Sequence, residues 1–539
     1  MHTNLTQLEN RLSGEANVDP ICALDEQIKG LEKTLTELKR TRNSLLNIHK
    51  LPPELLGKIF RRNVMLEGDF GGLEEGSHNF LFVCHHWFEV ASNTPELWGF
   101  WGNTPEDWTR WYPFSATAPL DLVLSGIDPD GRLNPTLFNV LQDRASRGTV
   151  RRVHLRSDDT RLLNTILSSL TSGREGIQSN RMESFLLWNW DQRSMDVSKF
   201  FTHHYFPKLQ RLCLINCTIS SWDLLRSRTG ELTKLHFDSI SPSPTQISLL
   251  SILASNPALQ EVTLLRQEVI NDRVDASSFR APLHHLRQLH LSGELRHVFG
   301  LLRQLDHPEA LDKLVITLHN CTDADIPLVI GPHLRSYLQR RGRTPTGLEL
   351  SLSSGDRIHF KVGDVGRVDK FVGMDKVVAL TVWLDHSIPE GLLVKAALDL
   401  LAYVPRKEVV YFRGADERAG MCGAYTQLPN LTTLCLADMR LPAMFPEPDS
   451  IENEGIPLSL QTLDLRNLTV DYNDWEPLTT FLARRASSGK PLNTLKVSSY
   501  DHICSVVVRN IKRVVQEFSA EEMDPLCPFG ICPGSRLRR

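Results

Sequence analysis

The chain has 539 residues, of which 41% are hydrophobic and 23% are charged, and its formal net charge is −4. This composition is typical of a folded globular protein, and the length predicts several domains or an array of repeats. No stretch approaches the roughly 18 to 20 apolar residues of a membrane span, the N-terminus lacks the features of a secretion signal, and the charge offers no basic stripe for nucleic acid. We therefore expect a cytoplasmic or nuclear protein that binds neither membranes nor nucleic acids.

The ten cysteines are spread over the whole length, and several lie inside apolar runs, which is typical of reduced, buried thiols. Cys527 and Cys532 could form a metal-binding hairpin, but no second pair with finger-like spacing accompanies them. The sequence also lacks a nucleophile elbow, a P-loop, an HExxH motif and a dinucleotide-binding motif. We therefore expect a protein that is not an enzyme and that holds no metal or other cofactor.

The first predicted element is a helix over residues 20–47. Asp19 and Pro20 suit its N-cap and first turn, and apolar residues follow at alternating steps of three and four. These residues are Ile21, Leu24, Ile28, Leu31, Leu35, Leu38 and Leu45, with Arg42 at the one polar position of the heptad pattern. The helix could form a coiled coil with a second copy of the chain. Alternatively, its shortness and an internal glycine would make it fold back on its own chain or stay partly helical.

Two short helical segments follow. Residues 51–60 read LPPELLGKIF, in which two prolines suit a first helical turn and apolar residues follow at helical spacing. Residues 80–101 read FLFVCHHWFEVASNTPELWGFW, in which apolar residues recur at steps of three and four before Asn93-Thr94-Pro95 ends the helix. Because two such helices bury little apolar surface, they need a partner or a neighbouring domain.

Together these segments resemble the F-box, a helical module that docks a chain onto the Skp-type adaptor of a cullin-RING ubiquitin ligase. The resemblance rests on LPxELLxxIF followed by VCxxWxxxAxxTPxLW, and a leucine-rich helix directly before an F-box is similar to large fungal F-box families. It implies a substrate receptor whose adaptor docking is carried or supported by Leu51, Pro52, Leu55, Ile59, Val83, Cys84, Trp87 and Trp98. The glycine-rich stretch 64–78, where the family has a shorter link, predicts a flexible loop.

Aromatic residues crowd together between Trp98 and Phe114. Arg110 is the one basic residue among them, which disfavours stacking on nucleobases. We expect these aromatic side chains to pack the helical module against the first strand of the following domain, PLDLVLSG at residues 119–126.

From about residue 150 an LxxLxL strand pattern recurs, and a variable stretch that often reads as a helix follows each copy. Neighbouring copies lie mostly about 23 to 32 residues apart, near the leucine-rich-repeat period. Residues 241–259 and 473–489 read as two of these helices, the second closing on Gly489. Residues 341–372 match least well and read as a strand followed by a hairpin-like insertion. The pattern favours an irregular leucine-rich-repeat-like solenoid; an α/β domain of another topology is the alternative.

In such a solenoid the residue between the last two leucines of each strand faces outward on the concave surface. That row is chemically mixed, which favours a protein or peptide partner: His154, Cys213, His236, Thr263, His290, Thr381, Cys435, Asp464 and Lys496. Its candidate substrate contacts are His236, His290, Asp464 and Lys496. The two histidines of that set lie about two strands, roughly 10 Å, apart, which is too far to share a zinc ion.

The sequence therefore predicts an α/β chain with an N-terminal coiled-coil-like helix (1–47), a small helical F-box (48–101), a leucine-rich-repeat-like domain with a strand and a helix per repeat (102–525), and a flexible tail (526–539). The resemblance implies the substrate-recognition subunit of an SCF-type ubiquitin ligase, which docks on the Skp adaptor and binds an unidentified protein substrate. The alternative is a non-enzymatic repeat scaffold that self-associates through residues 20–47.

Overall fold

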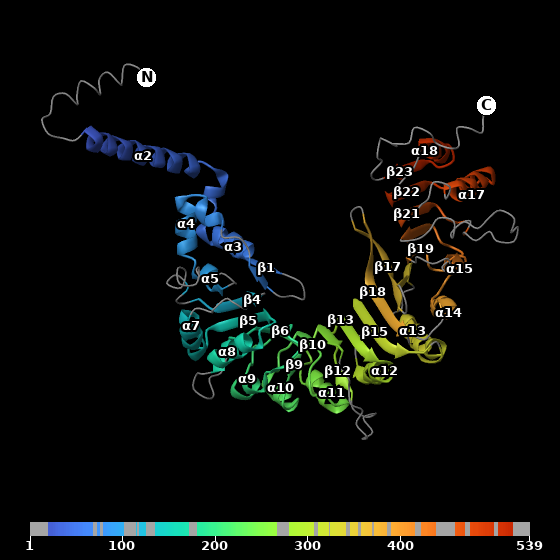
Figure 1. Cartoon of the computed structure of the whole chain (residues 1–539), viewed down its shortest axis with the longest axis horizontal. Helices are drawn as coiled ribbons and strands as arrows, with labels where there is room; N and C mark the ends of the chain where they lie inside the picture. Colours follow the sequence, from blue (N-terminus) through green and yellow to red (C-terminus); the bar gives the residue numbers. More distant parts are fainter. Residues whose placement is uncertain are drawn as a thin grey trace, which may run out of the picture. The chain divides into compact units, whose positions relative to one another are not determined.

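The computed structural model describes most of the chain, namely residues 20–67, 73–75, 79–101, 115, 118–125, 135–171, 181–266, 280–306, 311–322, 324–340, 345–353, 357–368, 371–384, 390–415, 422–437, 457, 459–468, 475–500 and 505–520. These residues form a mixed α/β structure with a mostly parallel set of strands (Figure 1). They divide into two compact units, unit 1 within Met1–Gln192 and His203–Phe206, and unit 2 within Arg193–Thr202 and Pro207–Arg539. The segment boundaries expected at residues 47, 101 and 525 stay predictions.

Unit 1 begins with the long helix α2 (Pro20–Ser44), which leads into the 3-10 turn η1 (Asn47–Lys50). The predicted helix is thus confirmed over nearly its whole range. Asp19, the predicted N-cap, lies outside the described residues. Thr34, Thr36 and Thr41 each donate a side-chain hydrogen bond to the carbonyl four residues earlier, so their hydroxyls are satisfied within the helix.

The helical module that follows consists of α3 (Pro53–Val64), η3 (Asn79–Phe82), α4 (His85–Ser92) and α5 (Pro95–Trp98). Helix α3 begins at a proline, as predicted, with Glu54 in its first turn and Arg61 and Arg62 in its last, which suits the helix dipole. The single helix expected over residues 80–91 is wrong. Cys84 has extended backbone (φ −167°, ψ 166°) and caps α4, so it interrupts the helix and separates the η3 turn.

The glycine-rich stretch between α3 and η3 contains two short strands, β1 (Met65–Glu67) and β2 (Leu73–Glu75), which pair antiparallel. The predicted loop at residues 64–78 is therefore ordered in part as a hairpin. Its glycines Gly68, Gly71, Gly72 and Gly76 lie outside the described residues, so the predicted flexibility there stays a prediction.

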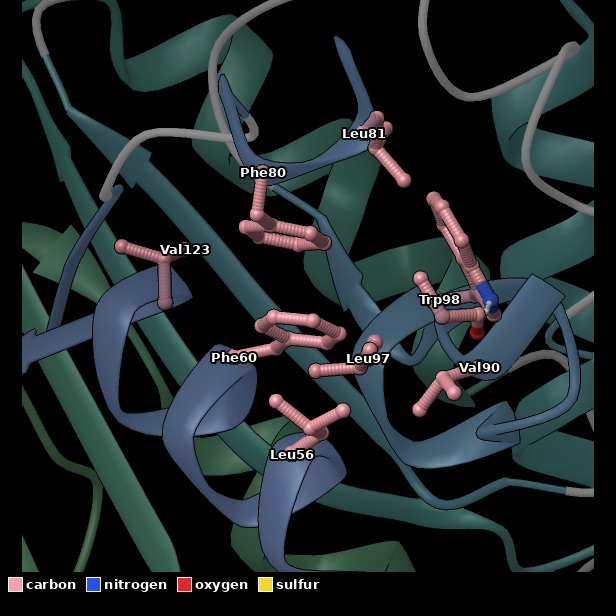
Figure 2. Packing of buried hydrophobic residues seen from close by; sticks show 9 residues of the cluster. Leu56, Phe60, Phe80, Leu81, Val90, Leu97, Trp98 and Val123 are labelled. Carbon is pink, nitrogen blue, oxygen red and sulfur yellow. Dashed lines mark hydrogen bonds between the residues drawn. The ribbon is translucent and has the colours of Figure 1, made fainter. Parts of the chain in front are cut away.

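The module and the first long strand of unit 1 share one apolar core (Figure 2). Phe60 stacks on Phe80 with ring centroids 4.5 Å apart, and Val123 of β4 (Leu120–Ser125) belongs to the same cluster. Trp98 is 1% exposed, and its indole Nε1 donates a hydrogen bond of 2.8 Å to the Ala91 carbonyl. The core of the module thus includes one residue of the 119–126 strand, Val123. The packing expected of the aromatic residues between Trp98 and Phe114 stays a prediction, since residues 102–114 lie outside the described part of the chain.

The backbone of α3 at Gly57 lies close to the side chain of Thr94, in the turn before α5. At Gly57 a Cβ atom would lie 3.2 Å from Oγ1 of Thr94, which leaves little room for any larger residue. The Thr94 hydroxyl itself donates a 2.7 Å hydrogen bond to the Val90 carbonyl. The glycine of the LLGKIF segment therefore permits the tight packing of the module.

The strands of unit 1 run parallel in the order β3 (Phe100–Trp101), β4, β5 (Val150–Ser157) and β6 (Ser184–Asn189), with α7 (Pro135–Ser146) and α8 (Thr160–Thr171) between them in sequence. The Asp121 carboxylate is fully buried and accepts hydrogen bonds from the Arg151 guanidinium. That hydrogen bond raises the pKa of Arg151. The buried charge is therefore paired, as burial requires.

Unit 2 is built on one continuous ladder of strands. β17 alone among them runs antiparallel to both neighbours, because it forms a hairpin with β18. Their spatial order is β8 (Arg211–Ile215), β10 (Lys234–Asp238), β11 (Glu261–Leu265), β13 (Gln288–Glu294), β15 (Lys313–Cys321), β18 (Phe371–Leu384), β17 (Arg357–Val368), β16 (Gly347–Ser353), β19 (Tyr411–Ala415), β20 (Thr433–Ala437), β21 (Thr462–Leu468), β22 (Thr494–Tyr500) and β23 (Glu517–Ala520). The strand and hairpin predicted between residues 341 and 372 are confirmed.

Helices follow many of these strands and lie along one face of the sheet (Figure 1). They include α10 (Asp223–Arg228), α11 (Gln246–Ala254), α12 (Leu295–Gln304), the π-helical turn η6 (Ile326–Ile330), α13 (Gly331–Arg340), α14 (Glu390–Leu401), α17 (Trp475–Ser487) and α18 (Ser505–Lys512). The predicted helices at 241–259 and 473–489 are therefore present in shorter form. Gly489 follows α17 with φ of +73°, as its predicted role at a helix end requires. Among the described helices, none has the length and apolarity that crossing a membrane requires.

Candidate functional site

The helical module leaves a set of large apolar side chains in solvent. On α3 these are Leu55 and Ile59, which lie one helical turn apart and are 45% and 48% exposed. At the η3–α4 junction they are Phe82, 78% exposed, with Val83 and Phe88. We call these five residues the apolar surface of the module. Exposed groups of this kind on a small, otherwise well-packed module are typical of protein interaction sites.

The residues that the F-box resemblance implies for adaptor docking divide into three groups. Pro52, Leu55, Ile59 and Val83 are exposed. Leu51 and Trp87 are half-buried and pack against the apolar core, and Cys84 is half-buried with its Sγ 3.6 Å from Nε2 of His49. Trp98 lies inside the core. Trp98 thus positions the module and has no surface with which to contact a partner.

Phe82 and Phe88 are exposed apolar residues that the sequence analysis did not single out as contacts. Phe82 belongs to the η3 turn, so it does not follow the helical spacing by which Phe80 and Val83 were found. Only the extended backbone of Cys84 reveals that Phe82 and Val83 turn outward together. A helical pattern alone could not have identified Phe82.

Charged and polar groups surround the apolar surface without forming a reactive site. Lys58 and Arg62 are exposed on α3, and the His85 imidazole lies 3.3 Å from the Glu89 carboxylate. Desolvation and the neighbouring His86 lower the pKa of His49, which favours its neutral form. These groups can support a polar rim around an apolar contact, the usual arrangement of a binding interface.

Unit 2 presents a second surface, the sheet face opposite its helices, which we call the open face. Strand register places one residue per strand in a single continuous row. That row is Cys213, His236, Thr263, His290, Val315, Ala379, Lys361, Glu349, Arg413, Cys435, Asp464, Lys496 and Ser519. The predicted contacts His236, His290, Asp464 and Lys496 are therefore all aligned on it.

The predicted position of Thr381 in that row is wrong. Thr381 pairs with Thr317, one pleat further along the strands, and Ala379 takes the position beside Val315. The cause is the length of β18, whose 14 residues continue into the hairpin with β17, so that the apolar pattern fits two registers. Lys361, Glu349 and Arg413 were missed because they belong to or follow this irregular region.

In the first half of the row the aligned residues carry no charge near neutral pH, and the flanking positions of the same face carry the ion pairs Lys234–Glu261 and Arg266–Asp238. His236 and His290 are separated by one strand, β11, as expected. Burial lowers the pKa of both, and for His290, with further contributions from Lys313 and His236, to about 4. Both imidazoles are therefore neutral near pH 7 and can each donate and accept one hydrogen bond.

The second half of the open face carries paired charges. Glu349 lies between two cations, with Lys361 Nζ at 3.2 Å and Arg413 Nη1 at 3.9 Å from its carboxylate. Arg466 binds the Asp464 carboxylate, with Nη2 2.6 Å from Oδ2, and Lys496 is exposed on the next strand. This half therefore offers fixed donors and acceptors of both signs to a partner.

Four residues that were expected to face outward are buried: His154, Cys213, Cys435 and Asp464, the last of which is also a predicted substrate contact. Nε2 of His154 in unit 1 lies 2.8 Å from the Ser184 hydroxyl, and the Asp464 carboxylate is held by Arg466. Burial, with a contribution from Asp464, raises the pKa of Cys435 to about 11, so this thiol is protonated and unreactive at neutral pH. The alternation of the strands was predicted correctly for these residues, but their exposure was not.

A cavity of about 570 Å³ lies on the opposite, helical side of the sheet. Its apolar lining includes Leu314 and Val378 of the sheet, and its polar lining includes Arg303 and His333 of α12 and α13. Because strand residues alternate between faces, this cavity does not open onto the row described above. The cavity and the open face are separate features of unit 2.

Among the described residues, no group of three or more His, Cys, Asp or Glu side chains is arranged to hold a metal ion. Compared with known proteins, the chain matches no protein-family model and no curated protein sequence.

Proposed function

We propose that this chain is the substrate-recognition subunit of an SCF-type cullin-RING ubiquitin ligase. In this proposal residues 48–101 include an F-box that docks on the Skp-type adaptor, and the sheet of unit 2 is a leucine-rich-repeat-like domain that binds a protein substrate. The observation that carries the proposal is the apolar surface of the module, Leu55, Ile59, Phe82, Val83 and Phe88, which remains exposed beside a complete core.

The neighbouring residues Leu55 and Leu56 show why this surface favours a partner. Leu56 is fully buried in the core, whereas Leu55 is 45% exposed, so the module does not need Leu55 for its own packing. Burying the remaining surface of such a side chain against a partner would contribute roughly 1 kcal/mol. Several residues of this kind on one small module together supply a hydrophobic contact of useful size.

The open face of unit 2 supports the assignment of substrate binding. It offers neutral imidazoles at His236 and His290 in one half and ion-paired charges around Glu349 and Asp464 in the other. A mixed surface of this kind suits a folded protein or a peptide with both polar and charged groups. The continuous strand register makes it one uninterrupted row.

The test is binding of the full-length chain to a purified Skp-type adaptor, measured with matched variants. We expect the double variant Leu55→Ala with Ile59→Ala to weaken adaptor binding at least tenfold, because two central apolar contacts are lost. Leu328→Ala removes a leucine of unit 2 that is 75% exposed, more than Leu55, and is expected to bind like the wild type. Equal binding by both variants, with unchanged thermal stability, would refute docking through this surface.

The second candidate function is a scaffold that self-associates without ubiquitin chemistry, which the exposed stripe of α2 favours. Deleting residues 20–46 distinguishes the two. A scaffold should lose assembly and all dependent binding, whereas a receptor should still bind the adaptor through residues 48–98.

A further inference from the structure

The apolar stripe of α2 is exposed along its whole length. Its members are between 46% and 74% exposed: Ile21, Leu24, Ile28, Leu31, Leu35, Leu38 and Leu45. A stripe of this length is costly to leave in water and is expected to be covered in the working protein. The order of the residues in the stripe indicates which partner covers it.

The stripe has the heptad order of a two-stranded coiled coil. The a positions are Ile21, Ile28, Leu35 and Arg42, and the d positions are Leu24, Leu31, Leu38 and Leu45, the last in the turn directly after the helix. Apolar residues at a and d form a seam that packs against the seam of a second helix, and an arginine within the seam selects among the arrangements in which those helices can pair. The stripe is thus complementary to a second copy of itself.

Arg42 decides the orientation of the two helices. In a parallel pair the a positions face each other, so Arg42 would meet Arg42 of the second copy inside the seam. In an antiparallel pair with full overlap, a positions face d positions, and Arg42 faces Leu24 while Ile21 faces Leu45. The two guanidinium groups then lie at opposite ends of the seam, where like-charge repulsion is small.

The residues that flank the seam point to the same orientation. The e positions carry Asp25, Glu32 and Lys39, all exposed. In an antiparallel pair of this register the e rows lie side by side, so Lys39 of one helix lies nearest Asp25 of the other, while the two Glu32 side chains meet at the middle of the seam. In a parallel pair Lys39 would instead flank the g-position Thr34 and gain no opposite charge. The antiparallel pair therefore forms two Lys39–Asp25 attractions against one Glu32–Glu32 repulsion, whereas the parallel pair forms no attraction along this row.

We propose that α2 pairs with α2 of a second copy of this chain as an antiparallel two-stranded coiled coil, with Ile21 of one helix opposite Leu45 of the other. The two chains then extend from opposite ends of a seam roughly 36 Å long, the rise of the 24 residue steps between them. This pairing does not depend on the adaptor-docking role of the helical module.

The experiment is a charge-swap series on the full-length chain, with the dimer dissociation constant measured by sedimentation equilibrium at low salt. Lys39→Glu places a like charge beside Asp25 of the second copy, and we expect dimerisation to weaken about tenfold, since the two symmetric Lys39–Asp25 pairs change from attraction to repulsion. The triple variant Asp25→Lys, Glu32→Lys, Lys39→Glu reverses the whole row and should recover wild-type affinity within about twofold.

Lys33→Glu is the matched control, because it makes the same charge change on the f position of the helix, away from the seam. It is expected to leave the dimer unchanged. A wild-type chain that stays monomeric at tens of micromolar would overturn the pairing itself. Lys39→Glu behaving like Lys33→Glu, or a triple variant without recovery, would overturn the antiparallel orientation. Adaptor binding, measured on the same variants, should not change.

Discussion

Helix α2 and the module at residues 48–98 both carry leucines at helical spacing, but the two regions use them differently. Along α2 every member of the stripe is exposed. In the module the leucines and aromatic residues are divided. Leu56, Phe60, Leu97 and Trp98 lie in a shared core (Figure 2). Leu55 and Ile59 lie in solvent. The first region is a helix without a core of its own, and the second is a packed module with a surplus apolar surface.

This difference shows that helical spacing identifies an apolar face but not what covers it. For α3 the cover comes from distant residues, Phe80, Trp98 and Val123, which the chain brings together only on folding. For α2 no such segment covers the stripe among the described residues, and the pairing with a second copy proposed above would cover it. Burial is therefore a property of the tertiary structure and not of the pattern.

The largest expected effect is on the stability of the module, and it distinguishes the adjacent residues Leu55 and Leu56. Leu56→Ala should lower the free energy of unfolding of the module by about 2 to 5 kcal/mol, since it leaves a cavity in the core. Leu55→Ala should change it by less than about 1 kcal/mol, because this side chain is half in solvent. Chemical denaturation followed by tryptophan fluorescence measures both. If both variants lose the same free energy of unfolding, Leu55 contributes to the core as much as Leu56 does, and the module does not differ from α2 by having a surplus apolar surface.

An intermediate effect is expected on the open face, where His290 is neither exposed nor part of the core. Its folded-state pKa of about 4 lies below the ordinary value of 6.5, so the unfolded chain takes up the proton first. Stability is therefore fully present above pH 6.5 and falls as the pH drops toward 4, by on the order of 2 kcal/mol. Lys313 and His236 strengthen this effect, and Asp238 opposes it.

The variant His290→Asn should remove this part of the pH dependence while keeping a polar side chain at the position. The measurement is the free energy of unfolding at pH 6.5 and pH 4 for both proteins, compared as a difference so that other titrating groups cancel. If the free energy of unfolding changes between pH 6.5 and pH 4 by the same amount in the variant as in the wild type, His290 is more solvated than its burial indicates.

The smallest expected effect concerns Gly30 in α2. A Cβ atom added there would meet no other atom within 4 Å, so Gly30→Ala should raise helix stability by about 1 kcal/mol without any clash. Hydrogen exchange of the α2 amides should then slow about fivefold. Unchanged exchange would indicate that α2 is already held by contacts along its whole length, contrary to its exposure.

Much of the architecture follows from local sequence features. The helix at 20–44, the proline start of α3, the strands of the LxxLxL copies, the hairpin of β17 and β18 and the helix end at Gly489 were all predicted. Each depends on local chemistry: apolar spacing, proline at a first turn, or glycine with a positive φ. Such features are set by residues that are neighbours in the sequence.

The features that were not predicted depend on long-range geometry. The break at Cys84 arises where η3 must turn Phe80 and Leu81 into the core, and the register of Thr381 depends on how far β18 continues beside β17. Likewise, Cys435 is covered by side chains of adjacent strands that lie far from it in sequence. The register of the predicted row was therefore correct except at Thr381, the exposure of several of its residues was not predicted, and the binding roles of these residues stay predictions.

The most direct measurement of the central claim is a calorimetric titration of the full-length chain with a purified Skp-type adaptor. The account predicts a saturable complex with one adaptor per chain, a dissociation constant below about 1 µM, and a negative heat-capacity change from burial of the module's apolar surface. No measurable binding at adaptor concentrations of tens of micromolar, from a chain shown to be folded, would contradict it.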